Sequence, residues 1–196
     1  MTFILASSSP RRRELLASIG IDFEVIPSHV PEEHRTGEAP EEYVARLSRD
    51  KAAAIAQKHP DRWVIAADTT VLMGDELLEK PADRADARRM LAAIAGRTHV
   101  VYTGVTIEHG SRCHRDTRVA ESEVRMLPLS AEDIAWYVET GEPLDKAGAY
   151  AVQGIGAMFI ESIHGSYTNV VGLPLALLFQ MLRNAGIDPL TVNDRR

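Results

Sequence analysis

The chain has 196 residues, of which 45% are hydrophobic and 26% are charged, and its formal net charge at pH 7 is −6. This length suits one large domain or two small lobes with a substantial core. The acidic balance argues against a protein that binds nucleic acid polymers broadly, and no apolar run approaches the length of a membrane span. The N-terminal residues lack a signal-peptide pattern, and a single cysteine, Cys113, fits a reducing compartment, so we expect a cytoplasmic protein.

The first predicted element is a short strand at residues 3–6, which leads directly into Ser7-Ser8-Ser9. Serine before Pro10, with Gly20 after the last apolar residue, predicts a helix from Pro10 to Ile19. The free N–H groups and the positive dipole end of such a helix start favour a multiply charged anion, as do the arginines of its first turn. We interpret this stretch as a phosphate-binding turn.

Three consecutive arginines, Arg11 to Arg13, would by default form a solvated surface. Arg12 argues against that default, because it shares one helical face with Leu15, Leu16 and Ile19. A guanidinium group on a core-facing stripe needs a partner, and an anion in a cleft would provide one. We therefore predict that Arg11 and Arg12 contact phosphate.

A short strand at residues 23–26 and a polar loop come next, and the loop contains two adjacent carboxylates, Glu32 and Glu33. Such a pair is most often solvated, and the alternative is that Glu32 binds a metal ion or a water molecule. An alanine-rich helix is then predicted from Pro40 to Lys58.

Lys51 lies in the middle of the apolar stripe of this helix. A lysine in that position either extends to solvent or serves a buried anion. Arg46 and Arg49 lie off the stripe, and we expect both to be solvated.

Residues 63–73 predict a buried strand that carries Asp68 in its middle. An ionised carboxylate is costly there unless it meets a metal ion, a cation or a reacting water. Asp68 is therefore the first candidate for catalysis. Gly74-Asp75 predicts a hairpin turn, and the return strand at 76–79 ends at Lys80, which either points back toward Asp68 or is a solvated edge lysine.

The second half of the chain predicts further alternating elements. These are a helix at 83–95, a strand at 99–108, one or two strands at 112–126, a helix at 130–140, a strand at 148–160 and a loop at 164–174 before a helix that ends near Ala185. We expect the tail after about residue 187 to fray.

Gly154-x-Gly156 is not a dinucleotide fingerprint, because the third glycine is missing and no helix is predicted to follow. We interpret it as a tight bend. Gln153, between apolar residues, needs an amide-complementary partner if buried and could read the edge of a base. Tyr167 could stack on a ring or simply pack.

Several familiar site motifs are missing from the sequence, namely the Gly-x4-Gly-Lys-Ser/Thr phosphate loop, His-Glu-x-x-His, paired cysteines and Gly-x-Ser-x-Gly. The seven histidines also lack ligand spacing, so zinc is not indicated. Other segments, in order over nearly the whole chain, resemble the Maf-like nucleoside triphosphate pyrophosphatases. They are residues 5–12 (Leu-Ala-Ser-Ser-Ser-Pro-Arg-Arg), 43–52, 67–69 (Ala-Asp-Thr), 79–81 (Glu-Lys-Pro), 101–105, 141–150, 153–156 (Gln-Gly-Ile-Gly) and 170–174.

This resemblance implies a mixed α/β fold of the Maf/ITPase-like kind, formed by residues 1–196 as one domain of two lobes. A central mixed sheet would be flanked by helices, and the active-site cleft would lie between the lobes. The resemblance also implies a homodimer, a divalent cation such as Mg²⁺ or Mn²⁺, and cleavage of a nucleotide between its α and β phosphates. The products would be a monophosphate and pyrophosphate.

The family's functional residues can be carried over position by position. The catalytic aspartate falls on Asp68, and the phosphate-binding lysines fall on Lys51 and Lys80. The signature serines and arginine fall on Ser7, Ser9 and Arg12, and the metal-associated carboxylates on Glu32 and Asp68. The acidic loop of relatives reads His29-Val30-Pro31-Glu32 here, which leaves only Glu32 in register.

Three specificity positions of the family read Arg12, Thr69 and Gln153 here, a combination that resembles the dTTP/UTP branch rather than the branch that acts on 7-methyl-GTP. Modified pyrimidine nucleotides are a further substrate class. A second hypothesis is a nucleotide-binding regulator of septum formation, because the family is also associated with that process. Asp68 together with two lysines favours catalysis, since a pure phosphate binder gains nothing from a nearby carboxylate.

Overall fold

The computed structural model describes residues 2–189, which divide into two compact units. Unit 1 holds residues 2–68, 103–120 and 172–189, and unit 2 holds residues 69–102 and 121–171. Three strands run from one unit into the other along the chain: β3 (Val64–Met73), β5 (Thr98–His109) and β6 (His114–Met126). We describe each unit separately.

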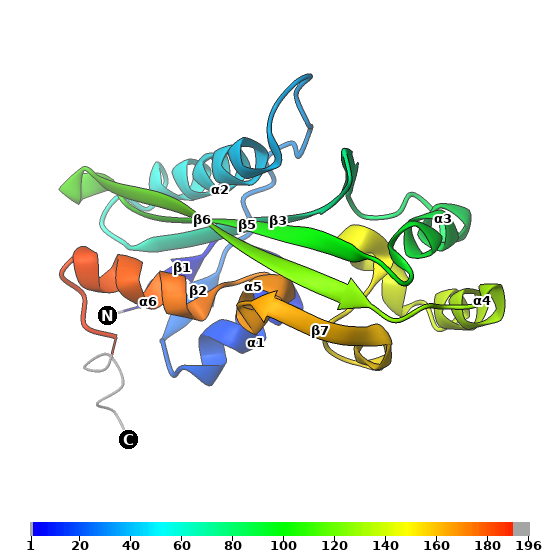
Figure 1. The fold of residues 1–196 in the computed structure, drawn as a ribbon. Helices are drawn as coiled ribbons and strands as arrows, with labels where there is room; N and C mark the ends of the chain where they lie inside the picture. The colour runs from blue at the N-terminus through cyan, green and yellow to red at the C-terminus, as the bar shows by residue number, and fades with distance from the viewer. Residues whose placement is uncertain (1, 190–196) are drawn as a thin grey trace. The chain divides into compact units, whose positions relative to one another are not determined.

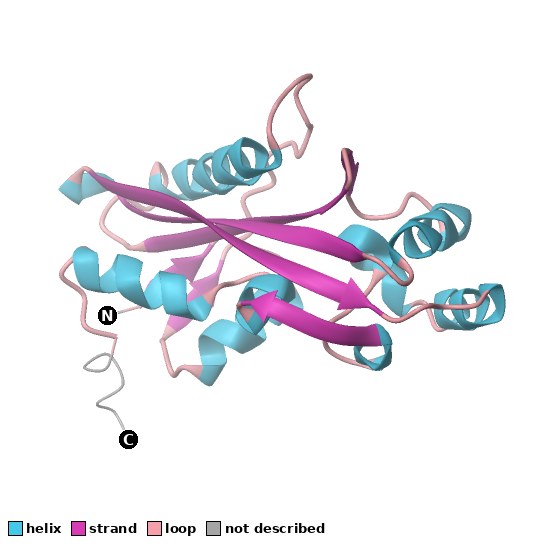
Figure 2. Cartoon of the chain, in the orientation of Figure 1, coloured by secondary structure: helices cyan, strands magenta, loops and turns pink. Residues whose placement is uncertain are grey.

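The other strands are short, and all but the last follow the sequence-based expectation closely. They are β1 (Phe3–Leu5), β2 (Phe23–Val25), β4 (Glu76–Leu78) and β7 (Ile160–Gly165). The helices are α1 (Pro10–Ser18), α2 (Pro40–Ala56), α3 (Arg84–Ile94), α4 (Ala131–Glu139), α5 (Tyr167–Val171) and α6 (Leu175–Asn184) (Figures 1 and 2). Single 3-10 turns are η1 (Gly110–Arg112), η2 (Glu142–Asp145), η3 (Ala147–Ala149) and η4 (Ile155–Phe159).

The strands form a mixed sheet in the order β2-β1-β3-β5-β6-β7, and β4 pairs with β3. β1 runs parallel to β2 and β3, whereas the pairs β3–β4 and β6–β7 are antiparallel. Parallel neighbours need crossover connections, which α1 and α2 provide. The expected mixed α/β class with a central sheet flanked by helices is confirmed.

In unit 1, α2 packs on one face of the first strands. Ala52, Ile55 and Ala56 of the helix contact apolar residues of β1, β3 and the chain that follows β1, among them Ile4 and Val64. Figure 1 shows α2 on one side of these strands and α1 and α6 on the other. The helix that carries Lys51 therefore rests on the same strands that lead to Ser7-Ser8-Ser9 and to Asp68.

Polar contacts and a glycine set how closely α2 approaches β5. A Cβ atom added to Gly104 would overlap the carbonyl group of Val44 in α2, so only glycine allows this approach. The Ser48 hydroxyl of α2 lies 2.9 Å from that of Thr106 in β5, and Thr106 lies 2.9 Å from Thr117 in β6. These buried hydroxyl contacts fix α2 on the sheet.

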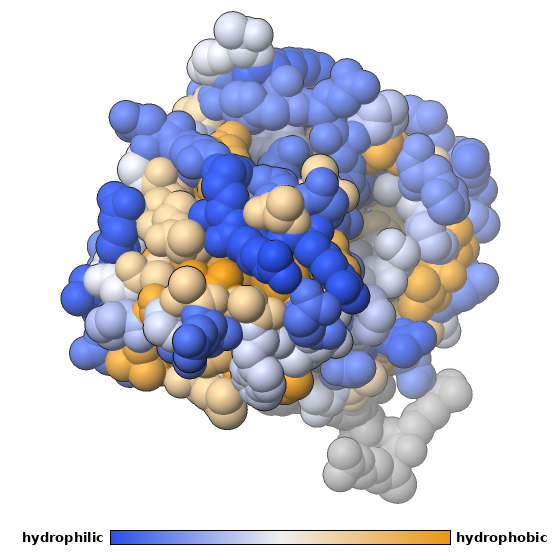
Figure 3. Space-filling model, turned by 90° about the vertical axis from the view of Figure 1, so that its right-hand side faces the viewer, coloured by the Kyte–Doolittle hydropathy of each residue, from blue (hydrophilic) through white to orange (hydrophobic). Residues whose placement is uncertain are grey.

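Unit 2 has its own core, in which α3 and α4 lie side by side. Leu91 and Ile94 of α3, and Tyr137 and Val138 of α4, belong to this cluster of buried residues. Figure 3 shows apolar residues scattered among hydrophilic ones on the face seen from the right of Figure 1. The most exposed large apolar side chains of unit 2 are Leu127, Trp136, Met158 and Tyr167. Over the described range, no helix is both long enough and apolar enough to span a bilayer.

The prediction of one strand from 148 to 160 is wrong. Gly148, Ala149 and Gly154 have φ angles of 72°, 57° and 91°, which a strand cannot contain. The chain instead forms η3, a bend and η4, and β7 begins only at Ile160. The interpretation of Gly154-x-Gly156 as a tight bend is therefore confirmed.

The predicted loop at 164–174 is also partly wrong, because it contains the short helix α5. The Ser166 carbonyl accepts hydrogen bonds from the amides of Asn169 and Val170, which begins a helical turn there. Most of the tail that we expected to fray, residues 190–196, lies outside the described residues.

Gly104→Ala should lower the free energy of unfolding by about 2 to 3 kcal/mol, because the added methyl group forces the α2 backbone away from β5. Gly74→Ala is the matched control: its Cβ meets nothing within 4 Å, and only its positive φ of 61° opposes the change, at about 1 kcal/mol. Urea unfolding at pH 7 measures both. If both variants lose the same free energy of unfolding, the close approach of α2 to β5 does not contribute to the cost of the Gly104 substitution.

Candidate active site

The start of α1 is built as an N-terminal cap. The Ser9 hydroxyl accepts the Arg12 amide at 3.5 Å, and Pro10 occupies the first turn. The Ser7 hydroxyl is buried and accepts hydrogen bonds from the Ser9 amide at 3.2 Å and from Arg12 Nη1 at 3.3 Å. Ser7 and Ser9 therefore order the turn that leads into the helix.

Arg12 is held from a second direction by a distant part of the chain. Its Nε donates to the Gly172 carbonyl at 2.7 Å, which ties α1 to the segment that precedes α6. Burial lowers the pKa of the Arg12 guanidinium, while the negative charges of Asp68 and Glu32 act in the opposite direction. An arginine remains protonated after such a shift, so Arg12 is a fixed positive charge close to two carboxylates.

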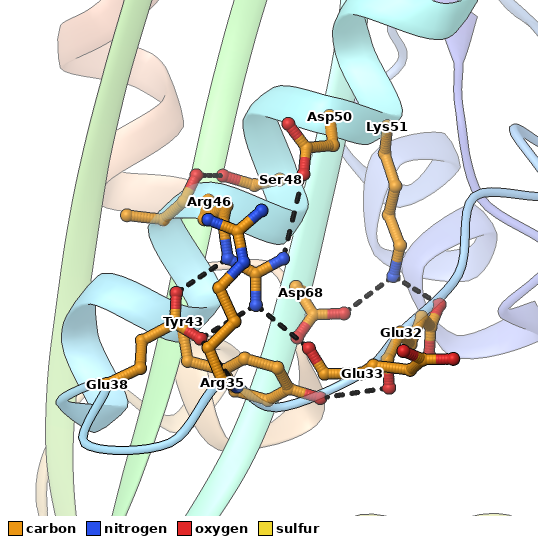
Figure 4. A network of polar contacts seen from close by, with 11 residues as sticks. Glu32, Glu33, Arg35, Glu38, Tyr43, Arg46, Ser48, Asp50, Lys51 and Asp68 are labelled. Carbon is orange, nitrogen blue, oxygen red and sulfur yellow. Dashed lines mark hydrogen bonds and ion pairs between the residues drawn. The ribbon is translucent and has the colours of Figure 1, made fainter.

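The centre of the site is the ammonium group of Lys51. Its side chain is 7% exposed, and Nζ lies 2.6 Å from Oδ1 of Asp68 and 2.5 Å from Oε1 of Glu32. Figure 4 shows Lys51 extending from α2 toward Asp68 on β3 and Glu32 in the loop that precedes α2. Lys51 thus meets a buried carboxylate instead of extending to solvent. The buried Asp68 in turn has the cation that its position in a strand requires.

The donor set around Lys51 has the chemistry of a hard-cation site. Two carboxylates, Glu32 and Asp68, converge on one point, and carboxylate oxygens are the ligands that Mg²⁺ and Mn²⁺ prefer. Within residues 2–189, no group of three or more His, Cys, Asp or Glu residues is arranged to hold a metal ion. Two protein carboxylates fit the habit of Mg²⁺, which usually completes its shell with water and substrate phosphates.

The loop that carries Glu32 is braced against α2 by Arg46. The guanidinium of Arg46 grips both oxygens of Glu38, at 2.6 and 2.7 Å, and donates to the Glu33 carbonyl at 2.9 Å (Figure 4). Its Cζ atom lies 5.6 Å from the centre of the Tyr43 ring, and the Tyr43 hydroxyl donates to the Glu32 carbonyl at 3.4 Å. The backbone carbonyl groups of Glu32 and Glu33 are therefore both tied to one helix.

The prediction that Arg46 is solvated is wrong, because its side chain is only 12% exposed and donates hydrogen bonds to both carboxylate oxygens of Glu38. Helical periodicity places Arg46 beside the apolar stripe, but it cannot show that the preceding loop folds back over that position. The sequence does offer one signal, since Tyr43 and Arg46 are three residues apart and share a helical face. Arg49 is exposed, as predicted.

The family assignment follows from a sequence match that spans almost the whole chain. A family model described as "Maf-like protein" matches residues 2–185. The chain belongs to the Maf-like family. It is 50% identical over 183 residues to a dTTP/UTP pyrophosphatase of Syntrophus aciditrophicus, covering 93% of this chain and 89% of that protein. It is also 50% identical over 184 residues to a dTTP/UTP pyrophosphatase of Myxococcus xanthus, covering 94% of this chain and 92% of that protein.

Among solved structures, this Maf-like chain resembles the Ham1 protein of Staphylococcus aureus. The TM-score is 0.50 at 16% identity, with 94% of this chain and 100% of that chain covered. At that identity, the likeness concerns the fold alone.

The remaining site residues that the Maf-like resemblance implies belong to unit 2. Thr69 follows Asp68 directly in β3 and is half-buried, Lys80 follows β4 and is exposed, and Gln153 lies half-buried in the bend before η4. Within the described part of the chain, the side chains of Lys80 and Gln153 make no hydrogen bond or ion pair. Their roles, and the cleft between two lobes, stay predictions.

The contact between Arg46 and Glu38 predicts how the stability of this Maf-like protein depends on pH. Hydrogen bonds from Arg46 lower the pKa of Glu38 from 4.5 to about 2. A carboxyl group with a lowered pKa in the folded state stabilises it above the unfolded pKa, and this contribution disappears as the pH falls from about 4.5 to about 2. Arg46→Met should therefore be less stable than the parent at pH 7, by about 1 to 2 kcal/mol, and should lose less stability on acidification.

Urea unfolding between pH 7 and pH 3 measures this difference, and Arg49→Met, an exposed arginine of the same helix, is the control. If the free energy of unfolding falls equally with decreasing pH in Arg46→Met and in the parent, Arg46 does not set the pKa of Glu38.

Proposed function

We propose that this Maf-like chain hydrolyses dTTP and UTP to the nucleoside monophosphate and pyrophosphate. The observation that carries the proposal is the buried ammonium of Lys51 between Asp68 and Glu32, close to the charge of Arg12. Relatives that are half identical over more than 90% of this chain are named dTTP/UTP pyrophosphatases, which supports the same substrate and reaction. Modified pyrimidine nucleotides with the same base edge fall within the proposal.

The triphosphate would be held by positive charge. Lys51 and Arg12 supply fixed charges from unit 1, and the start of α1 supplies the positive end of a helix dipole. Arg11 of the same turn and the exposed Lys80 of unit 2 are proposed as further phosphate contacts. Cations that already have fixed positions stabilise the charge that develops on the leaving group without having to reorganise.

Asp68 is the residue proposed to activate water. Its Oδ1 accepts a hydrogen bond from Lys51, which fixes the carboxylate, and Oδ2 would accept a proton from the attacking water. The water oxygen forms a bond to the α-phosphorus while the bond from that phosphorus to the bridging oxygen breaks. The electron pair leaves with pyrophosphate, so atoms and charge balance.

Glu32 and Asp68 would hold the divalent cation, Mg²⁺ or Mn²⁺. When bound, such an ion neutralises phosphate charge and acidifies a coordinated water. Lys51 occupies the point between the two carboxylates, so its ammonium group keeps them together when no other cation is present. The Arg46 brace holds Glu32 in place through the loop backbone.

Base recognition is assigned to Gln153, together with Arg12 and Thr69 as the other two specificity positions. A glutamine amide can donate to O4 of uracil or thymine and accept from their N3–H. Adenine does not present this pattern: its exocyclic amine is a donor, its N1 is an acceptor, and its larger ring system carries both farther from the sugar. We also propose a homodimer on the basis of the family resemblance, and a cytoplasmic location, which the exposed free thiol of Cys113 fits.

Asp68→Asn should reduce pyrophosphate release from UTP and dTTP by at least about a hundredfold, because the amide cannot accept the proton from water. The measurement is pyrophosphate release from a panel of nucleoside triphosphates with Mg²⁺ or Mn²⁺. Asp75→Asn, an exposed aspartate of the β3–β4 turn, is the control. Turnover near the parent value in folded Asp68→Asn would rule out the catalytic role.

Gln153→Ala should lower the ratio of kcat/KM for UTP to that for ATP by about tenfold or more, since the alanine variant loses the hydrogen bonds that the amide is proposed to make to the uracil edge. Gln57→Ala, an exposed glutamine after α2, is the control. An unchanged ratio would mean that another residue reads the base.

A further inference from the structure

The bend that carries Gln153 is tied down by one carboxylate, that of Glu142 in η2. Its Oε1 accepts the Ile155 amide at 2.9 Å, and its Oε2 accepts the Gly156 amide at 2.8 Å. A single side chain thus binds two successive backbone N–H groups just beyond Gln153. Both donors belong to the start of η4, where no residue of the turn itself provides a side-chain cap.

The hydroxyl of Tyr137 continues this contact to the other side of Gln153. Tyr137 is fully buried in α4, and its hydroxyl donates to Oε2 of Glu142 at 2.6 Å. The same hydroxyl oxygen accepts the Ala151 amide at 3.1 Å. The backbone two residues before Gln153 and two residues after it is therefore fixed to one hydrogen-bonded pair, which we call the Tyr137–Glu142 clasp.

The two glycines of Gly154-x-Gly156 are what allow the clasp to form. A Cβ atom added to Gly154 would overlap Oε1 of Glu142, and one added to Gly156 would overlap the Tyr137 hydroxyl. Glycine at these two positions lets the carboxylate and the hydroxyl reach the backbone. The motif that is not a dinucleotide fingerprint thus has a physical role in the bend.

The pKa shifts of Glu142 and Tyr137 fit a hydrogen bond between them that is always formed. Hydrogen bonds from Tyr137, Ile155 and Gly156 lower the pKa of the Glu142 carboxyl group against the opposing effect of burial. Burial and the neighbouring Glu142 raise the pKa of Tyr137, so its hydroxyl stays protonated and remains a donor. The backbone carbonyl of Glu142 also accepts from Lys146 at 2.6 Å, which anchors the residue from its other side.

We infer that Glu142 and Tyr137 are positioning residues for base selection, which they control by fixing the backbone on both sides of Gln153. The inference rests on the proposed role of Gln153. Since the Gln153 side chain has no hydrogen bond to any other residue within the described range, its placement depends on its backbone. A shift of about 1 Å in a side chain that recognises the base can lower the reaction rate by a large factor. The loss is largest for the nucleotide whose base depends most on that side chain.

The test compares Glu142→Gln and Tyr137→Phe with the parent, using kcat/KM for UTP and for ATP. Both variants should lower the UTP to ATP ratio by about fivefold to tenfold, because a displaced amide no longer lies where it can bond to the uracil edge. Asp133→Asn is the control: Asp133 also binds a backbone amide and a hydroxyl in unit 2, but at the start of α4. A variant that is merely less stable lowers both rate constants equally and leaves the ratio unchanged.

Parent protein and Gln153→Ala are measured in parallel, which separates the two proposals. If Gln153→Ala loses discrimination while Glu142→Gln and Tyr137→Phe keep the parent ratio, the positioning role is overturned and the role of Gln153 stands. If the parent shows no preference for UTP, or if Gln153→Ala keeps the parent preference, both proposals are overturned. Urea unfolding establishes the folded fraction of each variant, and Glu142→Gln decides the outcome if Tyr137→Phe does not fold.

Discussion

The ion pair of Lys51 with Asp68 and Glu32 is the interaction on which the rest of unit 1 depends. Isolated charges are costly to bury, so Lys51 on the inner face of α2 and Asp68 in the middle of β3 each lower the cost of burying the other. The close packing of α2 on β5 at Gly104 brings the lysine to the sheet, and the β3 strand presents the carboxylate. The fold therefore concentrates charges of both signs at one point, with the ammonium group of Lys51 between the carboxylates of Asp68 and Glu32.

Backbone segments that would otherwise move are held by side chains from rigid elements. In unit 1, Arg46 of α2 binds the loop that carries Glu32, and Gly172 supplies the carbonyl group that orients Arg12. In unit 2, Glu142 and Tyr137 perform the same kind of task for the bend at Gln153. Residues proposed to contact the nucleotide are thus supported by neighbours that do not, an arrangement that limits the entropy lost when the substrate binds.

Most of the secondary structure could be predicted from local patterns. Serine before proline marked the start of α1, an apolar run with β-branched residues marked β3, and glycine marked the hairpin after it. The errors occurred where non-local contacts override such patterns. Residues 148–160 contain apolar residues typical of a strand, but positive φ angles at Gly148 and Gly154 interrupt it. The hydrogen bonds that the Ile155 and Gly156 amides donate to Glu142 hold the resulting turn.

By itself, the sequence determined which groups are out of place for their surroundings: a lysine on an apolar helix face, an aspartate in a buried strand and an arginine beside leucines. Those anomalies, with the motifs around them, were enough to indicate the family and a phosphate site. Only the tertiary structure decided which charges meet, because the partners Glu32, Lys51 and Asp68 come from a loop, a helix and a strand that are 17 or more residues apart. It also assigned roles to Arg46 and Glu142, whose importance lies in hydrogen bonds to distant backbone, and such bonds leave no periodic signal in a sequence.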